Sequence, residues 1–256
     1  MATKMPVLFV GHGNPMNAIE ENDFSKAWIE EGRKLPQPRA ILCVSAHWVT
    51  RGTLVTAMDK PRTIYDMYGF PPELYEVRYD APGAPDLAGQ IRRIIKTTEV
   101  RDDFEWGLDH GTWSALRRMF PEANVPVVQM SLDAAIAAEK HYEIASQLKE
   151  LREDGVLVIG SGNIVHNLRL ARLEDSAYDW AVEFDQRVKN WIEQNDHDPI
   201  VHFERGDQAA ALAINSAEHY VPLLYSLALR DESDPISFFA DKVIGGSISM
   251  RSVKIG

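Results

Sequence analysis

The sequence is poor in cysteine, and this shortage excludes two kinds of structure. Its 256 residues include one cysteine, so neither an intrachain disulfide nor a cysteine-rich zinc site can form. That residue, Cys43, lies in an apolar run, and we expect it to be a buried and unreactive side chain. Such cysteine usage is typical of a reducing compartment, and we therefore expect a cytoplasmic protein.

Basic residues and long apolar runs are also scarce. The chain has 27 Lys and Arg against 38 Asp and Glu, which gives a formal net charge of −11. Such a charge repels phosphate backbones and anionic lipids, so we expect no nucleic-acid partner. No run approaches the roughly 20 apolar residues of a membrane span, and no signal-peptide core follows the first residues. We therefore expect no membrane partner.

Short apolar runs alternate with amphipathic stretches along the chain. The runs are rich in β-branched residues and predict buried strands at 7–10, 40–46, 125–130 and 156–159. The amphipathic stretches predict helices at 24–34, 85–96, 113–119, 134–151, 177–194 and 218–229. Residues 247–255 alternate in a way that suits a strand at or near an edge. The pattern predicts an α/β fold in a single domain, residues 1–256, with a central mostly parallel or mixed sheet flanked by helices.

Three histidines follow predicted strands. His12 is flanked by Gly11 and Gly13, His47 ends the second predicted strand, and His166 follows the fourth in a glycine-bearing turn. In open α/β sheets ligands bind at the carboxyl ends of strands, so we expect these three imidazoles to converge on one crevice. The Pro-rich residues 60–85 are too long for a plain connection, and loops of that length often shape a pocket.

Two further histidines lie where helices are predicted to begin. We expect Thr112 to cap the helix after His110, and Ser216 to cap a helix in which His219 is the third residue. Neutral imidazole is the commonest metal ligand, and catalytic metal sites usually use three protein ligands. The five histidines could therefore supply three ligands and a base, although no closely spaced metal motif such as His-Glu-x-x-His occurs.

Other residues of suitable type are expected to have structural roles. We expect three histidines to be exposed or hydrogen-bonded in the core, namely His141, His197 and His202. Arg51, Arg62 and Arg78 belong to the segment that includes the long loop. We expect them to be solvated, and the alternative is that one of them binds a substrate carboxylate.

Five motifs occur in a distinctive order. They are Gly11-His12-Gly13-Asn14-Pro15-Met16, Ser45-Ala46-His47-Trp48, Asp109-His110-Gly111-Thr112-Trp113, Gly162-Asn163-Ile164-Val165-His166-Asn167 and Glu218-His219-Tyr220-Val221-Pro222-Leu223. Together they resemble the 4,5-DOPA extradiol dioxygenase family, which belongs to the class III extradiol dioxygenases and to the superfamily of the protocatechuate 4,5-dioxygenase catalytic subunit. The resemblance extends from Met5 to Gly256. It implies an α/β fold with one mononuclear non-haem ion, Fe(2+) or Zn(2+).

The resemblance also implies roles for the histidines. His12 and His47 match the family's first two metal ligands, and the third is Glu218 or His219, with His219 favoured. His166 is implied as a further ligand or as the catalytic acid/base residue, and His110 as a second catalytic or substrate-orienting residue. Two histidines with a carboxylate would favour ferrous iron, whereas three or four histidines also suit zinc.

The activity that the resemblance implies is extradiol cleavage of a catechol such as L-DOPA. Both atoms of O2 enter the product, a ring-opened semialdehyde, so the implied partners are a small catechol and O2. Two alternatives remain open: a zinc-dependent hydrolase that uses the same histidines to activate water, and a noncatalytic metal-containing binding protein. Oxygen consumption with a catechol separates them.

Overall fold

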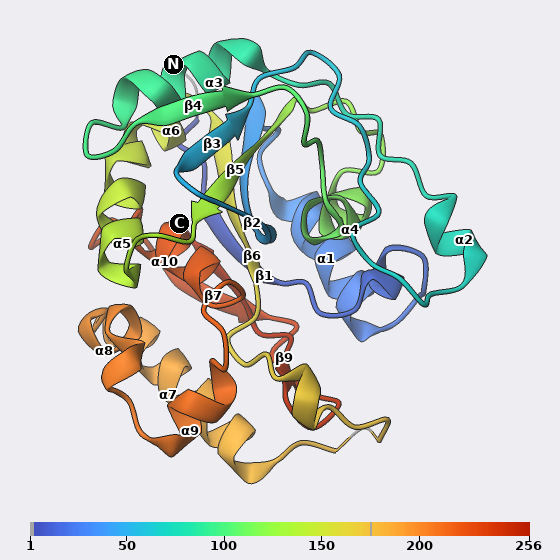
Figure 1. Ribbon diagram of the computed structural model, residues 1–256, viewed down its shortest axis with the longest axis vertical. Coiled ribbons are helices and arrows are strands. Elements are labelled where there is room, and N and C mark those ends of the chain that lie inside the picture. The colour runs from blue at the N-terminus through green and yellow to red at the C-terminus, as the bar shows by residue number, and fades with distance from the viewer. Residues whose placement is uncertain (1–2, 175) are drawn as a thin grey trace.

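The computed structural model describes residues 3–174 and 176–256, and one large sheet runs through the middle of the fold (Figure 1). The strands are β1 (Val7–Gly11), β2 (Ala40–Thr50), β3 (Thr53–Thr56), β4 (Val100–Asp103), β5 (Val127–Asp133), β6 (Val156–Gly162), β7 (Ile236–Phe239), β8 (Val243–Ile244), β9 (Ile248–Ser249) and β10 (Ser252–Ile255). The large sheet has the order β4-β3-β5-β2-β6-β1-β10-β7, and β8 pairs with β9 separately.

Helices connect and cover these strands. The α-helices are α1 (Asp23–Lys34), α2 (Pro72–Tyr75), α3 (Pro85–Ile94), α4 (His110–Met119), α5 (Ala138–Ser146), α6 (Glu150–Glu153), α7 (Asp179–Glu193), α8 (Asp198–Val201), α9 (Gln208–Ala213) and α10 (Val221–Leu227). Short 3-10 turns are η1 (Pro15–Ala18), η2 (Gln147–Lys149), η3 (Leu168–Leu170) and η4 (Phe203–Arg205). No described helix is both long and apolar enough to cross a bilayer.

The centre of the sheet is parallel, and an antiparallel pairing joins each side to it. Strands β1, β6, β2 and β5 pair in parallel, whereas β3 runs antiparallel to β5, and β10 runs antiparallel to β1 and β7. This confirms the predicted mostly parallel or mixed sheet. The strand predicted at 247–255 divides into β9 and β10, and β7 lies outside β10 at the sheet edge.

The central strands are buried on both faces, as continuous apolar runs predict. Val7 and Phe9 of β1 belong to the core beneath α5 and α10, while Leu8 and Val10 point to the opposite core beneath α1 and α4 (Figure 1). Cys43 lies in the second core, and its burial raises the pKa of the thiol to about 12. The expectation of a buried and unreactive cysteine is therefore confirmed.

Both predicted helix caps near the histidines were wrong. Asp109, not Thr112, caps α4, because its carboxylate accepts a hydrogen bond from the backbone of Thr112 at 3.1 Å and the helix starts three residues earlier than expected. Ser216 does not cap α10 but donates to Glu218, and α10 begins at Val221, with a proline in its first turn. His219 therefore lies in the turn before the helix.

Strand β2 is longer than predicted and irregular. It extends to Thr50, and its register with β5 shifts between Val44 and Val49. His47 therefore lies inside the strand, within an irregular stretch, and not at its end as expected. Such irregularities bend a strand and change the direction of its side chains, which allows the His47 side chain to turn toward the other histidines and not toward a face of the sheet.

Candidate metal centre

The structure brings all five singled-out histidines to one pocket. His12 follows β1, His47 lies in the irregular part of β2, and His166 follows β6. These strands are neighbours in the order β2-β6-β1, so their parallel carboxyl ends meet at one edge. His110 is the first residue of α4 and His219 precedes α10, and all five line a pocket of about 460 Å³.

Small residues on β6 let the His219 segment come close. A side chain at Gly162 would overlap the carbonyl oxygen of His219, which is also the acceptor for the backbone N–H of Asn163 at 2.8 Å. A side chain at Gly160 would likewise overlap the carbonyl oxygen of Pro222, the second residue of α10. The glycines of β6 therefore set the approach of His219 to the strand ends.

A buried carboxylate links two other histidine-bearing elements. Asp109 accepts a hydrogen bond from Ser45 at 2.7 Å, and the same serine hydroxyl accepts from the backbone N–H of His47 at 3.2 Å. Asp109 also caps α4, directly before His110. Burial raises the pKa of Asp109 to about 6. This residue therefore fixes His47 and His110 relative to each other through β2 and α4.

Hydrogen-bond partners fix which ring nitrogen of His12 carries the proton. The hydroxyl of Ser161 donates its one proton to the carbonyl of Gly111, so it must accept from Nδ1 of His12, at 2.9 Å. A neutral imidazole carries one proton, and Nε2 of His12 is therefore left with its lone pair exposed.

Carboxylates set the same tautomer in two further rings. Oδ2 of Asp66 accepts a hydrogen bond from Nδ1 of His110 at 2.9 Å, and Oε1 of Glu218 accepts one from Nδ1 of His219 at 3.2 Å. Because an ionised carboxylate only accepts, both Nδ1 atoms donate and both Nε2 atoms keep a lone pair. The same Oδ2 of Asp66 lies 3.3 Å from Nδ1 of His47, and its negative charge favours the proton on that nitrogen as well. A carboxylate behind a ligating histidine is the usual outer partner in metal sites.

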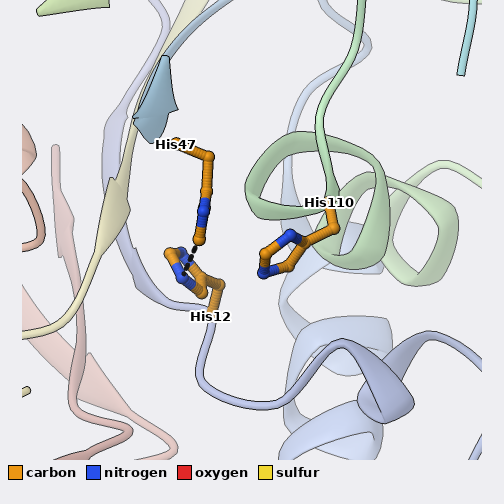
Figure 2. A group of neighbouring side chains, drawn as sticks. All are labelled: His12, His47 and His110. Carbon is orange, nitrogen blue, oxygen red and sulfur yellow. Dashed lines mark hydrogen bonds between the residues drawn. The ribbon is translucent and has the colours of Figure 1, made fainter. Parts of the chain in front are cut away.

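Two of these lone pairs face each other. Nε2 of His12 and Nε2 of His47 are 3.1 Å apart, and Figure 2 shows the two rings meeting tip to tip beside His110. Two nitrogens bound to one ion at about 2.1 Å lie about 3.0 Å apart in octahedral and about 3.4 Å apart in tetrahedral geometry. The observed distance fits two ligands of the same cation.

The ring of His219 has the spacing from His12 and His47 that a shared ion would require. An imidazole bound through Nε2 has its centre about 3.2 Å from the ion, so two such centres lie about 4.6 to 5.3 Å apart. The ring centres of His12, His47 and His219 are separated by 4.9, 5.4 and 5.0 Å. All three separations match a shared ion to within about 0.1 Å.

His110 and His166 fit a ligand role less well. The nitrogen atoms of His110 lie within 4.8 Å of those of His12 and His47, whereas His219 forms a separate group of possible ligand atoms with His166 and Glu218, so nitrogen spacing alone would favour His110 as the third ligand. However, its ring centre is only 3.8 Å from that of His47 and 5.7 Å from that of His12. His166 stacks on His219 at 3.5 Å with an 8° angle between the rings, too close for two ligands whose axes diverge from one ion.

Burial keeps four of the clustered imidazoles neutral by lowering their pKa. It lowers the pKa of His12 and His47 well below 6.5, and repulsion from the neighbouring histidines lowers the pKa of both further. Burial likewise lowers the pKa of His219, and that of His166 to about 3. Since the neutral imidazole is the form that binds metals, the donor set suits a soft or borderline divalent cation.

The rest of the pocket is mostly apolar, with one cation. The 60–85 loop contributes Met67, Tyr68 and Phe70, as its length suggested. The arginine in the lining is Arg172, which the sequence did not single out. The three arginines considered from the sequence do not line this pocket: Arg62 donates to a backbone carbonyl, Arg78 pairs with Asp80, and Arg51 is exposed.

The three histidines expected to have structural roles are bonded elsewhere. His141 is buried and hydrogen-bonded to Tyr225 and to a carbonyl, His197 contacts the hydroxyl of Tyr142, and His202 pairs with Asp198. None of the three lines the histidine pocket. Besides Arg172, sequence reasoning missed Asp66, because it reaches His110 across 44 residues of chain and belongs to no local motif.

The chain is similar to known proteins over its whole length. The profile of the catalytic LigB subunit of aromatic ring-opening dioxygenase matches residues 5–244. An Escherichia coli (strain K12) protein named 4,5-DOPA dioxygenase extradiol is 43% identical, and the match covers 100% of this chain and 96% of that protein. The Beta vulgaris protein of the same name is 34% identical, covering 96% of this chain and 94% of that protein.

A solved structure shares the fold. The crystal structure of an uncharacterized protein from Escherichia coli K12 superposes with a TM-score of 0.86 at 41% sequence identity. The superposition covers 98% of this chain and 100% of the other.

Proposed function

Because the chain belongs to the LigB family of aromatic ring-opening dioxygenases, it is an extradiol ring-cleaving enzyme, and we propose that its substrate is a catechol such as L-DOPA. The relatives named 4,5-DOPA dioxygenase extradiol support this choice of substrate. The proposed reaction takes up O2 and places both oxygen atoms in a ring-opened semialdehyde.

One metal ion, held by His12, His47 and His219, is the proposed cofactor. The observation that carries this proposal is the pair of facing Nε2 lone pairs of His12 and His47, 3.1 Å apart, with His219 at a matching ring distance. Glu218 is then the outer carboxylate that orients His219 and not a ligand, because its Oε1 accepts from Nδ1.

Ferrous iron is the proposed ion. When bound, it would supply Lewis acidity toward the two catechol oxygens and one-electron chemistry toward O2, which zinc lacks because it has no redox states in proteins. An all-histidine triad binds zinc as well, so zinc is expected to occupy the site and to give no oxygenation.

His166 and His110 flank the triad and are the proposed proton-carrying residues. His166 lines the pocket and has no hydrogen-bond partner on its ring among the described residues, so its nitrogens are free to take a catechol proton. His110 is held by Asp66 through Nδ1 and presents Nε2 to the pocket, where it can hydrogen-bond a substrate hydroxyl. The apolar residues around them, including Phe70 and Ile248, suit the aromatic ring.

The test is anaerobic loading of the metal-free protein with Fe(2+) or Zn(2+), followed by oxygen-electrode and absorbance measurements with L-DOPA and simpler catechols. We expect oxygen uptake and a yellow ring-opened product with iron alone. Stoichiometric metal binding without oxygen uptake on any catechol would contradict the proposal and favour the zinc hydrolase or the binding protein.

Two sets of variants separate ligands from proton carriers. His12→Ala, His47→Ala and His219→Ala should lose both the metal and turnover, as measured by metal analysis after desalting. His166→Gln should retain the metal while kcat falls by about 10²-fold or more, which is typical for loss of a general base. A His166→Gln protein that loses its metal would instead place His166 among the ligands.

A further inference from the structure

Among the described residues that line the histidine pocket, one carries a formal positive charge, and nothing in the proposed metal chemistry uses that charge. Arg172 lines this pocket together with the five histidines and apolar side chains, and no Asp, Glu or Lys occurs in the lining among the described residues. The chain as a whole carries a formal net charge of −11. An arginine unaccompanied by a carboxylate in the pocket of so acidic a protein indicates a site for an anionic group.

The guanidinium is held in place without using its hydrogen-bond donors. Its central carbon lies 3.8 Å from the centre of the Tyr178 ring, within the range of a cation–π contact. Within the described part of the chain, no side chain or carbonyl accepts a hydrogen bond from the guanidinium. This contact restrains the guanidinium and leaves its five N–H donors available to a ligand.

The backbone around Arg172 is also built for this arrangement. The N–H of Arg172 donates to the carbonyl of Gly245 at 2.8 Å, and the N–H of Tyr178 donates to Gly246 at 2.9 Å. A side chain on Gly246 would approach the Tyr178 ring to 2.9 Å, and its φ of +80° is one that glycine adopts without strain. The two glycines thus anchor both the arginine and the tyrosine on which it stacks.

We propose that Arg172 binds a carboxylate on the side chain of the catechol substrate and makes the enzyme selective for catechols that carry a carboxylate. This inference rests on the proposed function, because it assigns the catechol ring to the histidine end of the same pocket. A planar carboxylate matches the guanidinium edge in a two-point hydrogen bond, whereas an ammonium group finds no acidic partner in the described lining. The selected substrates carry a carboxylate on an aliphatic arm, as phenylpropionate-type and amino-acid catechols do.

The test compares three catechols that differ in the charge of the arm. They are 3-(3,4-dihydroxyphenyl)propionate, 4-methylcatechol and dopamine, which are anionic, neutral and cationic. We expect kcat/KM of the iron-loaded wild-type enzyme to decrease in that order. In Arg172→Met the ratio of kcat/KM for the anionic to the neutral catechol should fall about tenfold, which is the effect of one charge-assisted contact made by an exposed side chain.

Matched variants make the result specific. Arg169→Met removes an exposed arginine three residues away that does not line the pocket, and it should keep the wild-type ratio. Arg172→Lys retains the charge but not the planar edge, so its ratio should lie between those of the wild type and Arg172→Met. An anionic-to-neutral ratio that is the same in Arg172→Met and in the wild type would overturn the proposal.

Binding measurements separate this inference from the proposed function. Calorimetric titration of the metal-free protein with the propionate and with 4-methylcatechol reports on the anion site without turnover. If no catechol is oxidised but Arg172→Met still weakens propionate binding selectively, the anion site stands and the dioxygenase proposal fails. Equal binding of the propionate by the wild type and Arg172→Met would overturn the assignment of Arg172.

Discussion

Replacing Asp66 by asparagine tests whether one loop carboxylate sets the tautomers of two pocket histidines. Oδ1 of Asp66 accepts from the backbone N–H of His110 at 2.9 Å, while Oδ2 faces Nδ1 of His110 and Nδ1 of His47. Asparagine has one acceptor oxygen and one NH2 group. In either orientation of the amide, a donor then faces a donor.

The expected consequence is a loss of metal affinity. If the NH2 group faces the two imidazoles, their protons are favoured on Nε2, and His47 loses the lone pair that would bind the ion. Loss of an outer partner of a ligating histidine typically costs 10- to 100-fold in affinity, or about 1.4 to 2.7 kcal/mol. Because the contact to His47 is the longer one, 3.3 Å, we expect about tenfold.

The assay is competition for Zn(2+) between the protein and a chromophoric chelator at neutral pH, with circular dichroism as a check on folding. Asp80→Asn is the matched control, because Asp80 lies in the same loop but pairs with the exposed Arg78. We expect Asp80→Asn to bind the ion as the wild type does. Equal affinity of Asp66→Asn and wild-type protein would refute the reasoning that Asp66 sets the tautomers.

Two further predictions concern the glycine of β6 beside His219 and a buried ion pair outside the histidine pocket. Gly162→Ala places a methyl group against the carbonyl oxygen of His219, so we expect it to lower the unfolding free energy by about 1–3 kcal/mol and to weaken metal binding. Gly89→Ala is the control: inside α3 the added Cβ meets only Arg93 Nη1 at 3.4 Å, so we expect this variant to raise the unfolding free energy by about 0.5–1 kcal/mol. Urea unfolding and the chelator titration compare the two variants. Unchanged metal affinity in Gly162→Ala would contradict the role of the close approach between Gly162 and His219. Burial acts to raise the pKa of Asp234, but hydrogen bonds from buried Arg152 and from the backbone of Asp231 lower this pKa below 3.8. The stabilisation by the Asp234 carboxylate is therefore present above about pH 3.8, and it is lost as the pH falls through the lower folded-state pKa. Asp234→Asn should therefore cost about 3 kcal/mol in urea unfolding at neutral pH and less in strong acid, whereas an equal cost at both would show that the carboxylate charge is not the cause.

Much of the fold was predictable because its signals are local. Continuous apolar runs predicted the four central strands, since strands buried on both faces have no polar positions. The order of helices and strands predicted the layered α/β architecture. Element boundaries were less predictable: Asp109 replaced Thr112 as the cap of α4, and β2 continued beyond His47, because neither a cap choice nor an irregular strand is determined by periodicity.

The sequence by itself determined that His12 and His166 lie just past strands and that His110 and His219 lie near the starts of helices, because glycine turns, apolar runs and a proline have short-range structural effects. Only the tertiary structure decided their separate places: the ring centre of His219 lies 5.4 Å from that of His12 and 5.0 Å from that of His47, and His166 stacks on His219. It also brought Asp66 and Arg172 into the site. These contacts depend on the paths of long loops, which no local pattern of residues specifies.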